Sequence, residues 1–178
     1  MIYNVATLLK SPMGTTQDVT LNPDEMPSME ADGVRFAGPI TGTARLHRTS
    51  QGIWVDGTVT APVRLQCSRC LREFTQTFTV NLHEQFYPTI DIETGKPLQV
   101  SETTETYFPI DAHHQMDLSE AVRQNLLVTL PLAPLHRPDC KGLCPVCGID
   151  LNDAPDHRHA EEAGDERFAA LRKLLEEK

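Results

Sequence analysis

Apolar and polar residues alternate through the middle of the chain with the two-residue period of β-strands. Residues 41–48 fit a strand, residues 49–52 fit a turn, and residues 53–65 form a second strand-like run rich in valine and threonine. After Cys70 the alternation is stricter, because polar residues separate a regular apolar series made of Phe74, Phe78, Val80, Leu82 and Phe86. The pattern predicts a long hairpin whose bend, Cys67 to Cys70, carries both thiols at its tip.

The second half of the chain changes character. Residues 88–106 contain Pro88, Gly95 and Pro97 among threonine and acidic residues, which indicates an exposed loop. Over residues 117–130 the apolar side chains recur at helical spacing, after an acidic start and before Pro131, which predicts a helix. We therefore expect one α+β domain over residues 1–152, with a twisted antiparallel sheet and a packed helix. A polar linker and a short amphipathic terminal helix should follow over residues 153–178.

Composition agrees with an ordered domain. The chain has 178 residues, 39% of them hydrophobic, and a formal net charge of −9. Residues 1–10 lack the features of a signal peptide, and no apolar run approaches the roughly 18 residues of a membrane span. We expect a cytoplasmic protein with no membrane contact, in a compartment that keeps thiols reduced.

Charge is unevenly distributed along the chain. Residues 35–72 hold six arginines and one acid, whereas residues 81–120 hold eight acids against Lys96 alone. The arginines alternate with aromatic residues on strand-like segments, as an RNA-binding sheet face would require. The same two segments could instead neutralise each other, and the pI of about 5.2 is unlike that of strongly basic RNA-binding domains.

The cysteines carry the clearest chemical signal. They form two clusters, Cys67 with Cys70 and Cys140 with Cys144 and Cys147, and each cluster contains a C-x-x-C motif. Two such turns can complete a tetrahedral Zn²⁺ site, and in a reducing compartment this is favoured over disulfides. A closed four-ligand site leaves no position for water, so the expected zinc is structural.

The ligand set has more than one solution. The interpretation we favour is a zinc-ribbon-like centre in which both turns share one ion through Cys67, Cys70, Cys144 and Cys147. The alternative ligands are Cys140 and His136, which with Cys144 and Cys147 could hold an ion without the first pair. Basic residues beside the turns could offset the charge of the thiolates and also contact RNA; these are Arg64, Arg69, Arg72 and Lys141.

Other chemistry is less favoured. A thioredoxin-like C-x-x-C opens a helix, whereas Cys67 lies between strand-like segments, so thiol redox catalysis is a secondary hypothesis. His113, His114, His157 and His159 lie in polar sequence and are interpreted as solvated surface residues. Since the chain also lacks a nucleotide-binding loop and a nucleophile triad, we expect a protein that is not an enzyme.

The motifs together resemble one known family. The resemblance rests on four segments in order: Val63 to Leu71, Met116 to Glu120, Leu130 to Leu135 and Cys140 to Asn152. These are similar to the YceD family, described as large ribosomal RNA subunit accumulation proteins of bacteria and plastids. Cys67 and Cys70 match its first cysteine turn, and Cys140, Cys144 and Cys147 match its second cluster. The chain departs from the family at His136, where members often carry cysteine.

The resemblance implies a non-enzymatic role in accumulation of 23S ribosomal RNA and in assembly of the large ribosomal subunit. The expected partners are 23S rRNA, a large-subunit precursor or a ribosomal protein, with no small-molecule substrate. Two alternatives stay open: a thiol redox protein that uses one C-x-x-C pair, and a zinc-stabilised protein-interaction module without RNA contact.

Overall fold

The structure, a computed structural model, describes residues 1–21, 29–98 and 108–159. The expected terminal helix, whose apolar residues run from Phe168 to Leu175, lies outside these ranges, and so do part of the expected linker and part of the loop expected at residues 88–106. The domain boundary at residue 152 therefore stays a prediction.

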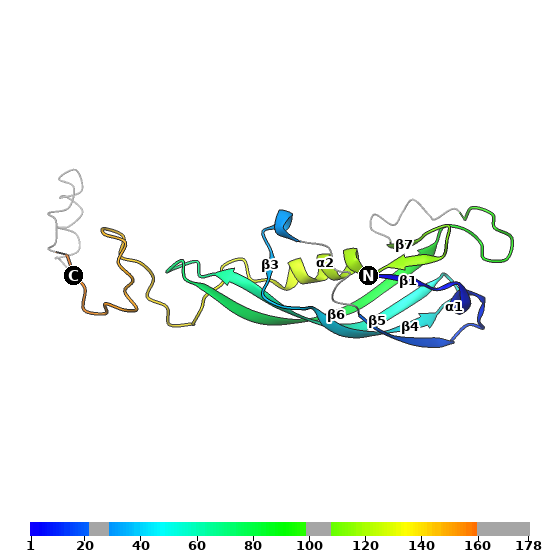
Figure 1. Cartoon of the computed structure of the whole chain (residues 1–178), viewed down its shortest axis with the longest axis horizontal. Helices are drawn as coiled ribbons and strands as arrows, with labels where there is room; N and C mark the ends of the chain where they lie inside the picture. Colours follow the sequence, from blue (N-terminus) through cyan, green and yellow to red (C-terminus); the bar gives the residue numbers. More distant parts are fainter. Residues whose placement is uncertain (22–28, 99–107, 160–178) are drawn as a thin grey trace, which may run out of the picture.

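One sheet of eight strands dominates the molecule (Figure 1). Its neighbours follow the order β1-β8-β7-β6-β5-β4-β2, and β3 pairs separately with β5. The strands are β1 (Ile2–Asn4), β2 (Thr16–Thr20), β3 (Arg35–Phe36), β4 (Thr41–Arg48), β5 (Ile53–Gln66), β6 (Glu73–Pro88), β7 (Phe108–Ile110) and β8 (Gln115–Asp117). Among the described residues, the helical segments are α1 (Ala6–Lys10), the 3-10 turn η2 (Glu30–Asp32) and α2 (Ser119–Thr129).

The central elements expected from the sequence are confirmed. The predicted strands correspond to β4, β5 and β6, and β5 pairs with β6 in one antiparallel register from Ile53 opposite Phe86 to Gln66 opposite Glu73. The bend between them contains Cys67 and Cys70. The predicted helix is α2, and Asp117 accepts a hydrogen bond from the backbone N–H of Ser119 at 2.9 Å, close to its first turn.

The expectation of a wholly antiparallel sheet is wrong at one pair of strands. β7 runs parallel to β6, with Phe86 opposite Phe108. Parallel neighbours need a crossover of about a dozen residues or more. The 19 residues between Pro88 and Phe108 are long enough for that crossover, so the pairing is compatible with the chain.

The apolar face of the sheet curls around α2 to form a half-barrel (Figure 1). Alternate residues of β5 and β6 are buried on this face, as the two-residue period requires. Phe86 is fully buried and stacks on Phe108 with ring centroids 5.1 Å apart. From α2, Asn125 donates a hydrogen bond to the Glu84 carboxylate of β6 at 2.8 Å. The helix thus closes the core, while the β5–β6 hairpin extends past it toward the chain that follows α2.

None of the helices within the described ranges is long and apolar enough to span a membrane.

Candidate metal centres

The tip of the β5–β6 hairpin is a tight cysteine turn. The backbone N–H of Cys67 donates to the carbonyl of Arg72, and that of Leu71 donates to the carbonyl of Cys67, both at 2.9 Å. Leu71 closes the turn in the left-handed region, with φ of 60°. Both thiols are buried, and they face the chain segment that follows α2.

That segment completes a first group of four candidate ligands, Cys67, Cys70, His136 and Cys140, whose ligand atoms all lie within 4.8 Å of one another. The Sγ atoms of Cys67 and Cys140 are 3.7 Å apart, and the Sγ of Cys70 is 3.4 Å from Nδ1 of His136. Tetrahedral Zn²⁺ with ordinary bond lengths would place sulfurs about 3.8 Å apart, and sulfur about 3.5 Å from nitrogen. The first group therefore fits a Cys₃His zinc site.

Backbone contacts hold the two halves of the first group together. The N–H of Ser68 donates to the carbonyl of Pro134 at 2.8 Å, and the Arg69 guanidinium donates to the carbonyl of Cys140 at 2.8 Å. The carbonyl of Arg69 accepts from the N–H of Leu143 at 3.2 Å. The hairpin tip is thus fastened to residues 134–143 independently of any ion.

The surroundings of the first group favour at least one thiolate. Burial raises the pKa of the Cys67 thiol, but hydrogen bonds from the His136 side chain and from backbone N–H groups outweigh burial and lower this pKa to about 5. Burial raises the pKa of Cys70. The side-chain amide of Asn152 donates to the Sγ of Cys140 at 3.4 Å, a contact typical of the groups that support metal-bound sulfur.

A second group lies further along the chain and consists of Cys144, Cys147, His157 and His159, again with all four ligand atoms within 4.8 Å. The backbone N–H of Cys144 donates to the carbonyl of Ile149 at 2.8 Å and closes the turn that carries the two cysteines. Gly148 lies in the left-handed region within this turn. Backbone N–H groups of Cys147 and Val146, together with the side chains of Cys147 and His157, outweigh burial and lower the pKa of Cys144 to about 6.

The structure does not bring Cys67, Cys70, Cys144 and Cys147 to one point. It places the two pairs in separate groups and supplies each with its own additional candidate ligands. The physical reason is the joint between Arg69 and residues 140–143, which seats Cys140 and His136 against the hairpin tip. His159 is exposed, as expected for a surface residue, and His157 is half-buried, but both imidazoles also contact Cys147 and are therefore candidate ligands.

The four basic residues singled out in the sequence have different surroundings. Arg69 is engaged with Cys140, and the Arg72 guanidinium pairs with Asp150 at 3.1 Å and Asp153 at 2.9 Å. Arg64 and Lys141 are exposed, and within residues 1–21, 29–98 and 108–159 neither forms an ion pair. Arg72 therefore bridges the hairpin tip to the chain segment that carries the second group, whereas Arg64 and Lys141 face solvent.

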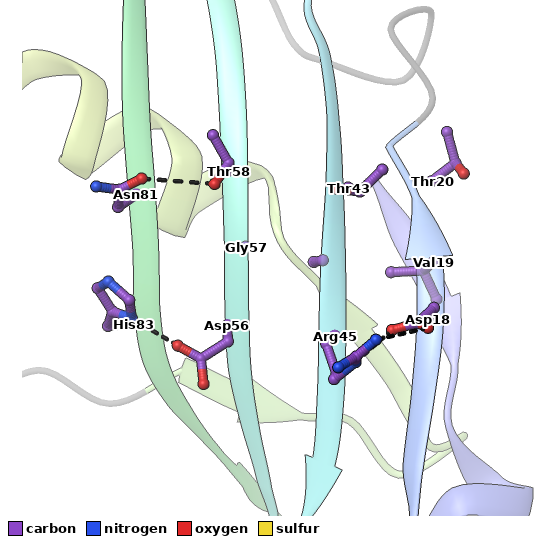
Figure 2. Close-up of a pocket in the computed structure, with 11 residues that line it drawn as sticks. Asp18, Val19, Thr20, Thr43, Arg45, Asp56, Gly57, Thr58, Asn81 and His83 are labelled. Atoms are coloured by element: carbon purple, nitrogen blue, oxygen red, sulfur yellow. Dashed lines mark hydrogen bonds and ion pairs between the residues drawn. The ribbon is translucent and has the colours of Figure 1, made fainter.

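The sheet face opposite the core is polar and rich in threonine. Figure 2 shows its centre, an open groove of about 550 Å³ over β2, β4, β5 and β6. Arg45 forms a bidentate ion pair with Asp18, and the imidazole of His83 lies 2.6 Å from the Asp56 carboxylate. Beside them the Thr58 hydroxyl lies 3.5 Å from Oδ1 of Asn81. The charges within the groove are thus paired with each other.

The curled sheet, the covering helix and the two cysteine–histidine groups, one at the hairpin tip and one further along the chain, define a mostly β protein with candidate metal centres. The chain belongs to the YceD family: the family model described as "Large ribosomal RNA subunit accumulation protein YceD" matches residues 55–175. This confirms the resemblance stated from the sequence motifs.

Curated relatives come from mycobacteria. Uncharacterized proteins of Mycobacterium bovis and Mycobacterium tuberculosis are 38% identical over 132 residues, which is 74% of this chain and 59% of theirs. An uncharacterized protein of Mycobacterium leprae is 32% identical over 127 residues, covering 71% of this chain and 55% of its own. The chain thus spans less than two thirds of the length of these relatives. No solved structure matches it.

Proposed function

We propose that this protein is a non-enzymatic, cytoplasmic ribosome-assembly factor that promotes accumulation of 23S rRNA by binding ribosomal RNA within a large-subunit precursor. The description of its family supports the ribosomal role. In this proposal Zn²⁺ bound by the first group holds the hairpin tip in place in ribbon-like fashion, and the polar sheet face beside the tip contacts RNA.

The proposed contact with RNA rests on a pair of arginines. Arg35 of β3 lies directly opposite Arg64 of β5, and both are exposed. Across the described part of the chain neither arginine has an ion-pair partner. Like charges directly opposite each other destabilise a sheet. A phosphate that bridges two guanidiniums would relieve this repulsion, and arginine suits such bidentate recognition.

Neighbouring residues extend the proposed contact. Thr75 is the cross-strand partner of Arg64, and Thr77 follows two residues along on the same strand; both are exposed. Their hydroxyls can donate to phosphate oxygens or bond ribose hydroxyls. Lys141 adds a further exposed cation beside the tip. Further from the hairpin tip on the same face, Arg45 is already neutralised by Asp18, so the two arginines without an ion-pair partner among the described residues lie nearer the tip.

The first group supports a structural role rather than redox catalysis. Cys67 has no exposed surface, and Cys70 and Cys140 are only 6% and 2% exposed. Thiol exchange requires an accessible thiolate. Four protein ligands also fill a tetrahedral Zn²⁺ ion, which leaves no position for a catalytic water.

RNA binding by purified zinc-loaded protein, measured on 23S rRNA and large-subunit precursor particles over a range of salt concentrations, tests the proposal. Replacing Arg35 and Arg64 by glutamine should weaken binding and reduce the magnitude of the salt slope by about 1, because the one phosphate that both guanidiniums contact is no longer neutralised. Arg45→Gln is the matched control, an arginine on the same face that is already paired with Asp18. If the Arg35→Gln/Arg64→Gln protein binds RNA as the Arg45→Gln protein does, this face does not contact RNA. Retention of ribosomal proteins without RNA would then favour a protein-interaction module.

A further inference from the structure

Three side-chain atoms of the second group form a closed triangle. Nε2 of His157 lies 3.1 Å from the Sγ of Cys147, Nε2 of His159 lies 3.2 Å from the same sulfur, and the two nitrogens are 2.9 Å apart. Each imidazole nitrogen carries at most one hydrogen, directed along a single line in the ring plane. Each nitrogen can therefore make only one well-directed hydrogen bond, so the three close contacts among the two nitrogens and the sulfur cannot all be hydrogen bonds. Such close donor atoms are instead typical of metal ligands, whose lone pairs point toward one ion.

We propose that the second group binds its own Zn²⁺, as a Cys₂His₂ centre that fills independently of the first group and exchanges its ion more readily. Cys144 supplies the fourth ligand atom, within 4.8 Å of the other three. Two thiolates and two imidazoles are a donor set that suits Zn²⁺ and leaves the site with no net charge. This centre does not depend on RNA contact, and it uses both histidines together with the exposed Cys147.

The two centres differ in exposure. In the first group three of the four ligands are buried, whereas Cys147 and His159 of the second group are exposed and His157 is half-buried. A chelator can reach the second ion without opening the fold, but reaching the first requires the hairpin tip to separate from residues 134–140. The second ion should therefore leave first.

The second centre also has a local task. Its four ligands lie within residues 144–159, so an ion closes only short loops there. Within this stretch Val146 and Ile149 are 69% and 42% exposed, so little apolar burial holds the backbone in place. When burial is this small, metal binding supplies much of the free energy that orders a segment. The ion should therefore order residues 144–159 and position Asp150 and Asp153 for Arg72.

Metal stoichiometry tests the assignment directly. Native mass spectrometry of the full chain, reduced and loaded with zinc, should find two ions. The His157→Ala/His159→Ala protein should keep one, and so should Cys140→Ser, which removes a ligand of the first group. His113→Ala is the matched control, an exposed histidine outside both groups, and should keep two. A wild-type protein with one ion overturns the proposal, as does a double variant that retains two.

A second measurement works on unaltered protein and does not depend on the folding of a variant. Cobalt-substituted wild type should show charge-transfer absorption from five thiolates on two ions, whereas a single shared centre would show four thiolates on one ion. Chelator should release the ions in two phases, and the fast phase should raise hydrogen exchange in residues 144–159 while leaving β5 and β6 protected. Release of both ions in one phase, or loss of both in the His157→Ala/His159→Ala protein, overturns the independence of the two centres. RNA binding is measured in a separate experiment, so its outcome bears on the proposed function and not on the number of bound ions.

Discussion

The Sγ of Cys67 lies 3.7 Å from the Sγ of Cys140, although 73 residues separate the two cysteines along the chain. The first belongs to the tip of the β5–β6 hairpin and the second to the segment after α2. Their contact therefore joins the end of the two longest strands to the chain that follows the helix. A shared ion at this point would close a long loop, which in chain-entropy terms stabilises the fold more than a local clip does.

Cys140→Ser should remove one zinc and loosen the hairpin tip without unfolding the core. The core residues of β5 and β6 are buried against the half-barrel and not against the cysteines, which form a cluster of their own. Hydrogen exchange should therefore rise in residues 66–73 and 134–143 and stay slow in residues 53–63. Ser68→Ala is the control, since Ser68 contributes its backbone N–H and not its side chain to the contact with Pro134. Global unfolding of Cys140→Ser under native conditions would contradict a tip that is separable from the core.

Gly142→Ala should weaken the contacts between Arg69 at the hairpin tip and residues 140–143. Gly142 has φ of +79°, and a Cβ there would lie 3.1 Å from the carbonyl oxygen of Arg69. We expect a loss of about 2 to 3 kcal/mol, made of about 1 to 2 for the left-handed conformation and the rest for the contact. Denaturant unfolding of the zinc-loaded protein measures it.

Gly148→Ala separates the two causes. Gly148 has φ of +73°, but a Cβ there would meet nothing within 4 Å. Only the conformational cost of about 1 to 2 kcal/mol is then expected. Equal losses in the two variants would mean that the close approach to Arg69 contributes nothing.

Phe86→Ala should destabilise the fold by about 3 to 5 kcal/mol, because the change leaves a cavity at a fully buried site. The loss should include the stacking contact with Phe108, the residue that pairs β7 with β6. Urea unfolding followed by circular dichroism gives the free energy. Phe86→Leu, which fills part of the cavity, should cost clearly less, and an equally large loss would point to the stacking geometry and not to volume.

Acid should remove a small stabilising contribution at the start of α2. Hydrogen bonds from Arg123 and Gln124 lower the pKa of Glu120 to about 2 from 4.5. A carboxyl whose pKa is lower in the folded chain stabilises the fold fully above the unfolded pKa, and this contribution is lost as pH falls from about 4.5 to about 2. Since Glu120 is 48% exposed, its ion pair with Arg123 is worth only about 0.2 to 1 kcal/mol.

Glu120→Gln should therefore be slightly less stable than wild type at pH 7, and the difference should vanish toward pH 2. Thermal unfolding over this pH range measures the difference, with Glu73→Gln as an exposed control that lacks an ion pair among the described residues. A difference that persists unchanged at pH 2 would show that the effect is not carried by the charge of Glu120.

The long elements were predictable because each repeats its pattern many times. β5 and β6 run for 14 and 16 residues, so the two-residue period is unmistakable, and α2 has 11 residues with an acidic start. β1, β7 and β8 have three residues each, too few to show any period. Their positions are decided by pairing with distant strands, and for that reason the parallel contact of β7 with β6 was not predictable.

The cysteines were predictable as candidate ligands, but their grouping was not. Spacing shows which residues can bind zinc, whereas grouping depends on the joint between Arg69 and residues 140–143, a contact between segments far apart in the chain. His157 and His159 lie in polar sequence that looks solvated. The signal that could have found them is local: Cys144, Cys147 and the His-x-His pair place four donors within one short stretch.

The separation of Cys67 and Cys140 also sets the order in which the protein matures during its synthesis. At about 5 to 20 residues per second, roughly 4 to 15 s pass between the appearance of the first cysteine turn and that of its partners. Throughout that interval Cys67 and Cys70 have neither His136 nor Cys140 beside them. The nascent chain thus presents two unprotected thiols to oxidants and to competing metals, and the donors of the second group emerge only after those of the first are complete.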